Sequence, residues 1–217
     1  MSKIFLSLMA ADQLNLEHEI KKFEVYCDGF HLDVMDFHFV PNLTFGITAI
    51  NQIARVTNKP LNVHLMVDDP EELLEQLHLR PNTLVTFHIE SAENPDRLIK
   101  KIKNKELLAG IALSPEISYD MVNKYLMYID QLLIMGVEPG FSGRELIPAA
   151  ISTLETVAIL KKAKNLKMTI AIDGGITEKN IVELKNKGAE VFHIGSAVFD
   201  TDDHITALER LYDVLNG

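Results

Sequence analysis

Histidine and aspartate alternate in the segment His31-Leu32-Asp33, where one apolar residue separates two polar ones. Side chains two positions apart on a β-strand point the same way, so an extended segment would present an imidazole and a carboxylate to the same space. That pair suits a divalent metal ion such as Zn²⁺, Mn²⁺ or Fe²⁺. The alternative is a buried His–Asp pair that only satisfies its own hydrogen bonds, and the pair by itself does not exclude this.

Two further segments carry the same residue types. His64 lies in Asn62-Val63-His64-Leu65-Met66, and Asp173 precedes two glycines in Asp173-Gly174-Gly175. Taken singly, a core histidine and a capped turn explain these residues equally well. Taken with the first pair, they supply two imidazoles and two carboxylates, which is a plausible four-ligand metal site.

Two carboxylates at one site also suit proton transfer at carbon. A proton beside a carbonyl group is weakly acidic, and a metal ion on the carbonyl oxygen stabilises the enediolate that forms when the proton leaves. One carboxylate can take that proton while the other returns a proton to the opposite face, which inverts the stereochemistry. This role requires at least one carboxylate with a tuned pKa.

Such residues need a scaffold, and short apolar runs alternate with segments of helical periodicity along the chain. Between the runs, Leu16, Ile20 and Phe23 have helical spacing, as do Ile47, Ile50 and Ile53. The expected strands are Ile4–Leu8, Phe30–Val34, Leu61–Leu65, Leu84–His88, Leu107–Leu113, Gln131–Gly136, Met168–Asp173 and Glu190–Ile194. Alternation repeated eight times predicts an α/β fold with a parallel sheet, and that count favours a closed (β/α)8 TIM barrel over an open doubly wound sheet.

In a barrel, catalytic groups lie at the carboxyl ends of the strands, where all four candidate ligands fall. Helix starts are signalled by Asp69-Pro70 and Asn94-Pro95, and also by Ser118 and Thr177 as capping residues. Gly188 would close a helix over 178–187. No linker rich in proline, glycine or serine divides the chain, so residues 1–217 are expected to form a single domain.

Glycine-containing turns follow the last three predicted strands. The sixth strand leads into Gly136-Val137-Glu138-Pro139-Gly140-Phe141-Ser142-Gly143-Arg144, and the eighth leads into Gly195-Ser196-Ala197. In barrels the loops after strands seven and eight commonly bind phosphate together with a helix N-terminus. Gly175 and Gly195-Ser196 fit that placement, and Arg144 is one of few basic groups near any strand end. A phosphorylated ligand is therefore expected.

Other residues near the strand ends suggest supporting roles. Methionine usually fills core space, but a group of methionines at one end of a barrel would form a floor that excludes water from the reacting carbons. His88 and Glu90 could support the metal site from behind, whereas His193 has no evident partner. The methionines at or just beyond strand ends are Met9, Met35, Met66 and Met135.

Composition narrows the possible partners and compartment. The 217 residues carry a net charge of −10, without a basic patch to attract nucleic acid or anionic lipid. The apolar run Ile4–Ala11 is too short to span a membrane and lacks a cleavage pattern, so neither a membrane anchor nor a signal peptide is expected. Cys27 is the only cysteine, which excludes an internal disulfide and fits the reducing cytoplasm. We expect its thiol to be buried and inert.

At these residues the sequence resembles the ribulose-phosphate 3-epimerase family over essentially its whole length. The resemblance rests on Ser7-Leu8, His31-Leu32-Asp33-Val34-Met35-Asp36, His38-Phe39-Val40-Pro41-Asn42, His64-Leu65-Met66-Val67, Met135-Gly136-Val137-Glu138-Pro139-Gly140-Phe141, Asp173-Gly174-Gly175-Ile176 and Gly195-Ser196-Ala197-Val198-Phe199. So many motifs in the same order are highly specific. The resemblance implies the closed barrel.

The resemblance also implies an activity. The family interconverts D-ribulose 5-phosphate and D-xylulose 5-phosphate through a cis-enediolate, with one divalent metal ion, and its members commonly assemble into homo-oligomers. By position, His31, Asp33, His64 and Asp173 match the ligands of a Zn, Fe, Mn or Co ion, with Asp33 as the proton acceptor and Asp173 as the donor. The matching substrate contacts are Ser7, His64, Met35, Met66, Met135, Gly140, Phe141, Ser142, Gly143, Gly174, Gly175, Gly195 and Ser196.

Three departures from the family pattern leave the substrate open. Leu6 replaces a proline before the first-strand serine, Phe37 replaces a glycine, and Ser142 and Arg144 alter a loop that usually reads Gly-Phe-Gly-Gly-Gln. We expect all of them near the mouth of the barrel, where Phe37 and Arg144 could reshape the pocket for D-allulose 6-phosphate. The intact glycine turns favour the pentose phosphate.

Two other functions are compatible with a phosphosugar barrel. Decarboxylases and Schiff-base aldolases of related fold need a lysine at the strand ends, but Lys59 and Lys167 precede the strands instead of following them. A non-catalytic phosphosugar-binding protein would be expected to have lost some of the four candidate ligands, and all four are present.

Overall fold

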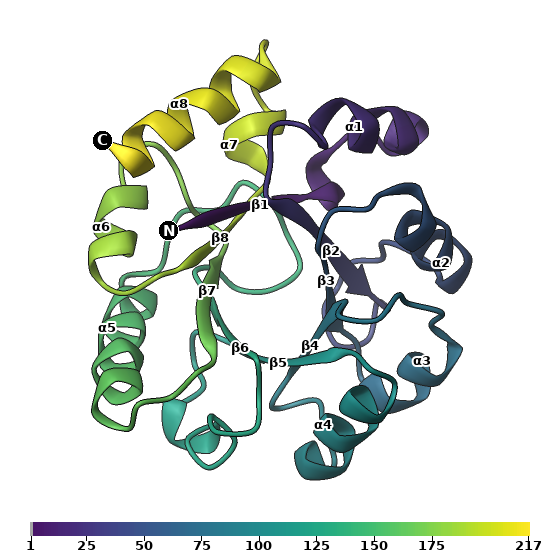
Figure 1. Ribbon diagram of the computed structural model, residues 1–217, viewed down its shortest axis with the longest axis vertical. Coiled ribbons are helices and arrows are strands. Elements are labelled where there is room, and N and C mark those ends of the chain that lie inside the picture. Colours follow the sequence, from purple (N-terminus) through teal and green to yellow (C-terminus); the bar gives the residue numbers. More distant parts are fainter. Residues whose placement is uncertain (1) are drawn as a thin grey trace.

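The computed structural model describes residues 2–217, and its centre is a closed barrel of parallel strands surrounded by helices (Figure 1). Each strand pairs with the next in chain order, and the first pairs with the last. The strands are β1 (Lys3–Ser7), β2 (Gly29–Met35), β3 (Leu61–Met66), β4 (Leu84–His88), β5 (Leu108–Leu113), β6 (Gln131–Met135), β7 (Thr169–Asp173) and β8 (Val191–Ile194). The predicted barrel and all eight strands are confirmed, and the strand boundaries lie close to the predicted ones.

Helices cover the outside of the barrel (Figure 1). They are α1 (Leu16–Phe23), α2 (Ile47–Val56), α3 (Pro70–Gln76), α4 (Pro95–Asn104), α5 (Pro148–Ala163), α6 (Ile181–Asn186), α7 (Ser196–Phe199) and α8 (His204–Asn216). The alternation is imperfect, because within the described chain β5 and β6 are joined through a 3₁₀ helix, Tyr119–Met121, and turns. Ser118 caps this short helix, where its side chain accepts a hydrogen bond from the Asp120 N–H.

Strand side chains alternate between two environments. Outward-facing residues such as Leu6 and Leu32 are fully buried and belong to the main apolar cluster, which also contains helix residues such as Ile20 and Ile50. A smaller apolar cluster lies inside the barrel. The inner wall at the carboxyl end is polar, and this is where the candidate ligands lie.

The capping signals predicted some helix starts and not others. The side chains of Asp69 and Asn94 accept hydrogen bonds from backbone N–H groups at the starts of α3 and α4, as predicted. The prediction that Thr177 starts a helix over 178–187 was wrong, because α6 begins only at Ile181. Asn180 accounts for the delay, since its side chain binds the Thr177 N–H and the Gly175 carbonyl in a local turn that competes with the helix.

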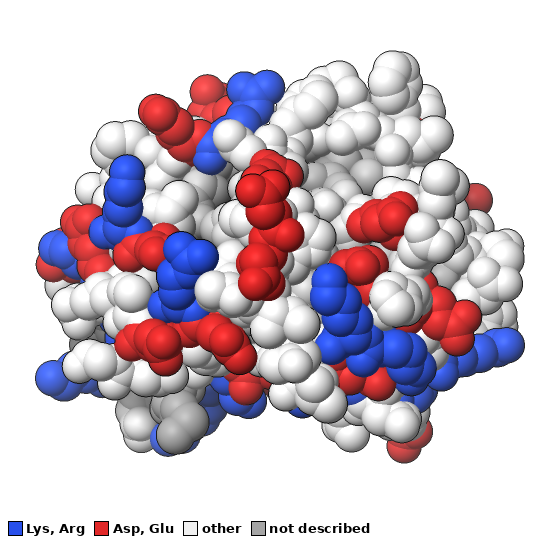
Figure 2. Space-filling model, turned by 90° about the horizontal axis from the view of Figure 1, so that it is seen from above, with Lys and Arg blue, Asp and Glu red and all other residues white. Residues whose placement is uncertain are grey.

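The single thiol agrees with its prediction, and the surface mixes charges of both signs. Among the described residues, no helix combines the length and apolar character needed to cross a bilayer. Figure 2 shows acidic and basic side chains interspersed on one face of the molecule. Cys27 is buried, and this burial raises the pKa of its thiol to about 12, so the thiol is protonated and unreactive at neutral pH.

Candidate active site

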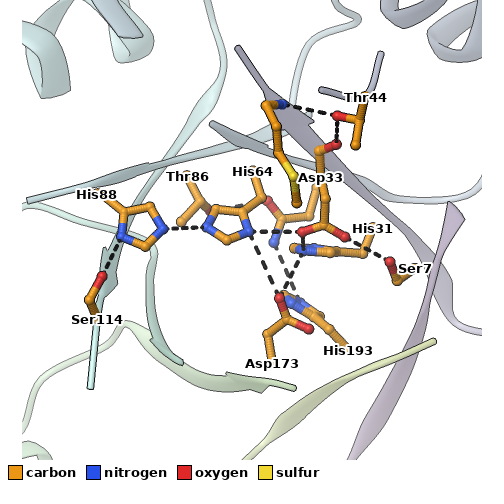
Figure 3. Close-up of polar contacts among 12 residues, drawn as sticks. Ser7, His31, Asp33, Thr44, His64, Thr86, His88, Ser114, Asp173 and His193 are labelled. Atoms are coloured by element: carbon orange, nitrogen blue, oxygen red, sulfur yellow. Dashed lines mark hydrogen bonds and ion pairs between the residues drawn. The ribbon is translucent and has the colours of Figure 1, made fainter. Parts of the chain in front are cut away.

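Four side chains converge at the carboxyl end of the barrel: His31, Asp33, His64 and Asp173. One potential ligand atom from each lies within 4.8 Å of all the others (Figure 3). Oδ1 of Asp33 is 2.9 Å from Nε2 of His31 and 3.0 Å from Nδ1 of His64. Oδ2 of Asp173 is 3.5 Å and 3.9 Å from the same two nitrogens. The structure therefore brings together the residues that the sequence motifs singled out.

Strand register explains this convergence. Asp33 on β2 is the direct neighbour of His64 on β3, and His31 lies two positions earlier on β2, so its side chain shares the inward face. The backbone at this end of β2 is held by Thr44, whose hydroxyl donates to the Asp33 carbonyl at 2.6 Å and accepts from the Met35 N–H at 3.0 Å. This clamp fixes the direction in which the Asp33 carboxylate leaves the strand.

Asp173 reaches the cluster from β7, on the other side of the barrel. The turn that follows it has positive φ at both Gly174 and Gly175, and a Cβ at Gly175 would lie 2.5 Å from the backbone nitrogen of Leu146. Only glycine allows this close approach between the β7 turn and the β6–α5 loop. The turn is secured by the Asn180 amide, which donates to the Gly175 carbonyl at 2.8 Å.

The protonation of the cluster residues depends on their neighbours as well as on burial. Burial alone would raise the pKa of Asp33, but the neighbouring His31 and hydrogen bonds from both histidines outweigh it and hold the pKa well below its ordinary value. Burial also disfavours protonation of His31, yet the negative charges of Asp33 and Asp173 prevail and raise its pKa to about 10. For His64 burial dominates and lowers the pKa. In the metal-free cluster a buried carboxylate therefore faces one protonated and one neutral imidazole.

The donor set fits a divalent metal ion. Ligand atoms held at about 2.0–2.2 Å from one ion stand about 3–3.6 Å apart, and the closest donor pairs here are at 2.9, 3.0 and 3.5 Å. The four side chains are between 0 and 14% exposed, so the site is nearly dry. The positive charge lost when His31 gives up its proton would be replaced there by the charge of the metal ion. Two imidazoles and two carboxylates accept Zn²⁺, Fe²⁺, Mn²⁺ or Co²⁺ alike.

A cavity opens above the cluster and is lined by most of the predicted substrate contacts. His31 and His64 are fully buried beneath it, whereas Asp33 and Asp173 reach its wall. The predicted contacts that line the cavity are Ser7, Met35, Met66, Met135, Gly140, Phe141, Ser142, Gly143, Gly174, Gly175, Gly195 and Ser196. Met9 lines it too, so the four methionines share one space with the two carboxylates.

The β6–α5 loop, which forms one side of the cavity, is tied to the loop after β2. The Asn42 amide donates to the Gly140 carbonyl at 2.7 Å, and Val40 packs where a side chain at position 140 would begin. Arg144 lines the cavity and its guanidinium lies 5.0 Å from the centre of the Phe141 ring. Among the described residues that line this cavity, Arg144 is the one lysine or arginine.

Two of the departures from the family pattern lie elsewhere than the sequence suggested. Leu6 points outward from β1 and is fully buried against the helices, so it does not touch the cavity. Phe37 was also expected to shape the pocket, but its side chain is 65% exposed and does not line the cavity. Its backbone adopts φ +66°, a conformation that glycine adopts without strain. Ser142 and Arg144 do lie at the mouth, as expected.

Three residues that matter to the site's construction were given no role from the sequence patterns. Thr44 and Asn42 act through single hydrogen bonds, which no residue pattern signals. His193, which had no evident partner, lines the cavity and stacks on His31 with ring centres 3.8 Å apart. Its position on β8 two residues before Gly195 was a usable signal, because that spacing places it on the inner face.

The sequence is similar to known proteins over almost its whole length. Residues 3–199 match the model of the ribulose-phosphate 3 epimerase family. The chain is 36% identical over 205 residues to a ribulose-phosphate 3-epimerase of Mycobacterium bovis, covering 94% of this chain and 89% of that protein. It is 33% identical over 212 residues to one of Helicobacter pylori, covering 98% and 97%.

Solved structures share the fold at low identity. A 3-keto-L-gulonate-6-phosphate decarboxylase from Vibrio cholerae matches with a TM-score of 0.72 and 13% identity, covering 99% of this chain and 97% of the other. An orotidine 5'-monophosphate decarboxylase from Sulfolobus solfataricus matches with a TM-score of 0.68 and 12% identity, covering 100% and 98%. These similarities concern the barrel alone. Lys59 and Lys167 precede β3 and β7 and so lie at the opposite end of the barrel from the cluster.

Proposed function

The chain belongs to the ribulose-phosphate 3-epimerase family and is an isomerase, and we propose that it interconverts D-ribulose 5-phosphate and D-xylulose 5-phosphate at this four-residue cluster. The observation that carries this proposal is the placement of two carboxylates, Asp33 and Asp173, on opposite sides of one buried four-donor cluster at the floor of a cavity. Inversion at carbon needs a proton removed from one face and another delivered to the opposite face.

Each carboxylate has a distinct part in the proposed reaction. The Asp33 carboxylate takes the proton from C3 of the ketose, and the carboxyl group of Asp173 delivers a proton to the other face of the same carbon. In the reverse direction the two exchange roles. A divalent ion bound by His31, Asp33, His64 and Asp173 would act as a Lewis acid toward the charge that develops on the substrate oxygens.

Other cavity residues hold the substrate and keep water out. Ser7 stands beside Asp33 at the cavity wall, where its hydroxyl can contact a sugar oxygen. Met35, Met66 and Met135 present polarisable sulfur and methyl groups to the reacting carbons without offering a proton. This apolar contact favours a charge-delocalised planar intermediate and excludes bulk water that would protonate it at random.

The phosphate end of the substrate is assigned to the three glycine loops. Gly175, Gly195 and Ser196 follow the adjacent strands β7 and β8, and Arg144 on the β6–α5 loop adds a positive charge. A chain with net charge −10 needs such a local attraction for a dianionic group. Arg144 and Ser142 are also the substituted residues of the one departure that reaches the cavity, so they bear on the choice between pentose and hexose phosphates.

The test is turnover of D-ribulose 5-phosphate and of D-allulose 6-phosphate, side by side, by protein loaded in turn with Mn²⁺, Fe²⁺, Co²⁺ and Zn²⁺. We expect a strong preference for the pentose. A preference for the hexose would retain the fold, cluster and mechanism, and would assign Ser142 and Arg144 to substrate choice. Failure of both substrates with all four metals would overturn the epimerase proposal and favour a phosphosugar-binding protein.

Three wider expectations accompany the proposal. We propose that residues 1–217 act as one catalytic domain, that the protein works in the cytoplasm, and that it assembles with copies of itself. The closed pairing of β1 with β8 supports the first of these, because both ends of the chain contribute to one sheet. Sedimentation of the purified protein at several concentrations measures its oligomeric state.

A further inference from the structure

His64 has a second nitrogen that points away from the cluster, toward another buried histidine. Nε2 of His64 lies 3.0 Å from Nε2 of His88, with both side chains fully buried and the ring planes 22° apart (Figure 3). Two imidazole nitrogens at this distance share one proton, so one ring donates and the other accepts. The groups on the two outer sides of this pair determine which way the proton lies.

Beyond His88 stands a carboxylate. Nδ1 of His88 is 3.1 Å from Oε1 of Glu90 and 3.0 Å from the hydroxyl of Ser114 at the end of β5. The Ser114 hydroxyl in turn donates to the same Glu90 oxygen. The Glu90 side chain is 22% exposed, so this chain of contacts runs from the cluster to the edge of the barrel.

The two imidazoles lie between two carboxylates, Asp33 and Glu90, and each carboxylate favours a hydrogen on the nitrogen that faces it. An ionised carboxylate can only accept, so Nδ1 of His88 carries the hydrogen and its Nε2 presents a lone pair. The His88 lone pair favours the form of His64 that carries its hydrogen on Nε2, whereas Asp33 favours a hydrogen on Nδ1. Glu90 and His88 therefore lower the cost of opening the Nδ1 lone pair toward a metal ion. A metal ion needs that lone pair, and imidazole ligands are commonly oriented by such an outer carboxylate.

The other imidazole of the cluster lacks this support. Nδ1 of His31 is buried without a hydrogen-bond partner among the described residues, and its ring lies against His193 instead. The two histidines are thus held differently, one by packing and one by a hydrogen-bonded chain that ends in a charge. Because of this asymmetry, the position of the hydrogen on His64 depends on residues outside the cluster.

We propose that Glu90, acting through His88, is a positioning residue that favours the form of His64 whose Nδ1 is open, and thereby raises the affinity of the cluster for a divalent cation. The inference rests on the proposed function only in assuming that the cluster binds a metal ion. Its consequence is measurable without substrate. Outer partners of this kind typically contribute ten- to a hundredfold in metal affinity.

The experiment measures the Kd for Co²⁺ and the visible absorption of the bound ion in metal-free wild-type protein and in Glu90→Gln. Glutamine keeps the size of the side chain but can donate a hydrogen to Nδ1 of His88. The hydrogen of His88 would then lie on Nε2, and that of His64 on Nδ1. We expect a loss of affinity of about tenfold or more in Glu90→Gln, with an altered absorption spectrum. Glu93→Gln removes the same charge from the same loop at a position 92% exposed, and should match the wild type.

Two further readouts separate positioning from general damage. Glu90→Asp keeps the acceptor charge and should recover part of the affinity. In ¹⁵N spectra of histidine-labelled protein titrated with Zn²⁺, the His64 hydrogen should move to Nε2 at a lower Zn²⁺ concentration in the wild type than in Glu90→Gln. Wild-type affinity in Glu90→Gln, or equal losses in Glu90→Gln and Glu93→Gln, would overturn the inference. A wild-type protein that binds no Co²⁺ would instead refute the proposed metal site itself.

Discussion

The Ser7 hydroxyl donates a 2.7 Å hydrogen bond to Oδ2 of Asp33, the oxygen that the two histidines leave free. The two oxygens of the Asp33 carboxylate therefore have different partners. Its Oδ1 faces the cluster, whereas its Oδ2 is held at the cavity wall by a residue from the neighbouring strand β1. This arrangement allows one side chain to be both a metal ligand and a base.

Replacement of Ser7 by alanine should reduce turnover without abolishing it. The lost hydrogen bond to a charged group corresponds to about 1.5–3 kcal/mol, or roughly a ten- to hundredfold drop in kcat/KM. Steady-state kinetics of Ser7→Ala with D-ribulose 5-phosphate measure this drop, and Ser7→Thr, which keeps the hydroxyl, is the control. An unchanged kcat/KM in Ser7→Ala would show that the Asp33 carboxylate needs no such support.

The two carboxylates should be distinguishable by isotope exchange. With saturating Co²⁺, Asp33→Asn and Asp173→Asn should each lower epimerisation by roughly 10²–10⁴-fold, which is the usual contribution of a general base or acid. In D₂O, Asp173→Asn should still exchange the C3 hydrogen of D-ribulose 5-phosphate, because Asp33 remains to remove it. Asp33→Asn should not. NMR detection of deuterium at C3 gives the answer, and the opposite pattern would exchange the assigned roles.

Arg144 should affect substrate binding more than chemistry. We expect Arg144→Gln to raise KM for the phosphorylated ketose several-fold while kcat changes little, because the charge meets the phosphate in the ground state and the transition state alike. The wild-type KM should also rise more steeply with ionic strength than that of the variant. Arg97→Gln, on the exposed face of α4, serves as the charge-matched control. A fall in kcat with constant KM would contradict this assignment.

Metal binding should release a proton at neutral pH. The pKa of His31 is raised to about 10 from its ordinary 6.5, so its imidazole is protonated at pH 7 in the metal-free protein and must lose that proton before it can bind a metal ion. We therefore expect release of about one proton per ion and an affinity that rises with pH through the neutral range. Calorimetry in buffers of different ionisation enthalpy counts the proton, and a count near zero would contradict the assigned charge state.

Phe37 should respond to substitution in an unusual order. Its φ of +66° is strained for any residue with a Cβ, so Phe37→Gly should be more stable than Phe37→Ala by about 1 kcal/mol. At an ordinary loop position the order is reversed, because glycine gives the unfolded chain more freedom. Urea unfolding of the two variants supplies the comparison. Higher stability of the alanine variant would mean that the loop relaxes out of this conformation.

Much of the fold and site could be predicted because the signals are local. Apolar runs mark the strands, and a spacing of two residues in an extended segment is enough to place His31 and Asp33 on one face. The stacking of His193 on His31 depends on barrel closure, which brings β8 near β2, and no local pattern reports that. The outward direction of Leu6 follows from its alternation with Ser7. The positive φ of Phe37 depends on neighbouring loops, including the hydrogen bonds of the Asp36 carboxylate with the N–H groups of His38 and Asp68.

The pairing of β1 with β8 also determines when the barrel can close during synthesis of the protein. Lys3 pairs with Val191 and Leu6 with Ile194, so the first strand of the barrel to be synthesised pairs with the last one. At a synthesis rate of about 5–20 residues per second, the edge of β1 that pairs with β8 remains unpaired for on the order of ten to forty seconds. Any sheet that forms during that interval has one unpaired edge, and unpaired strand edges promote aggregation.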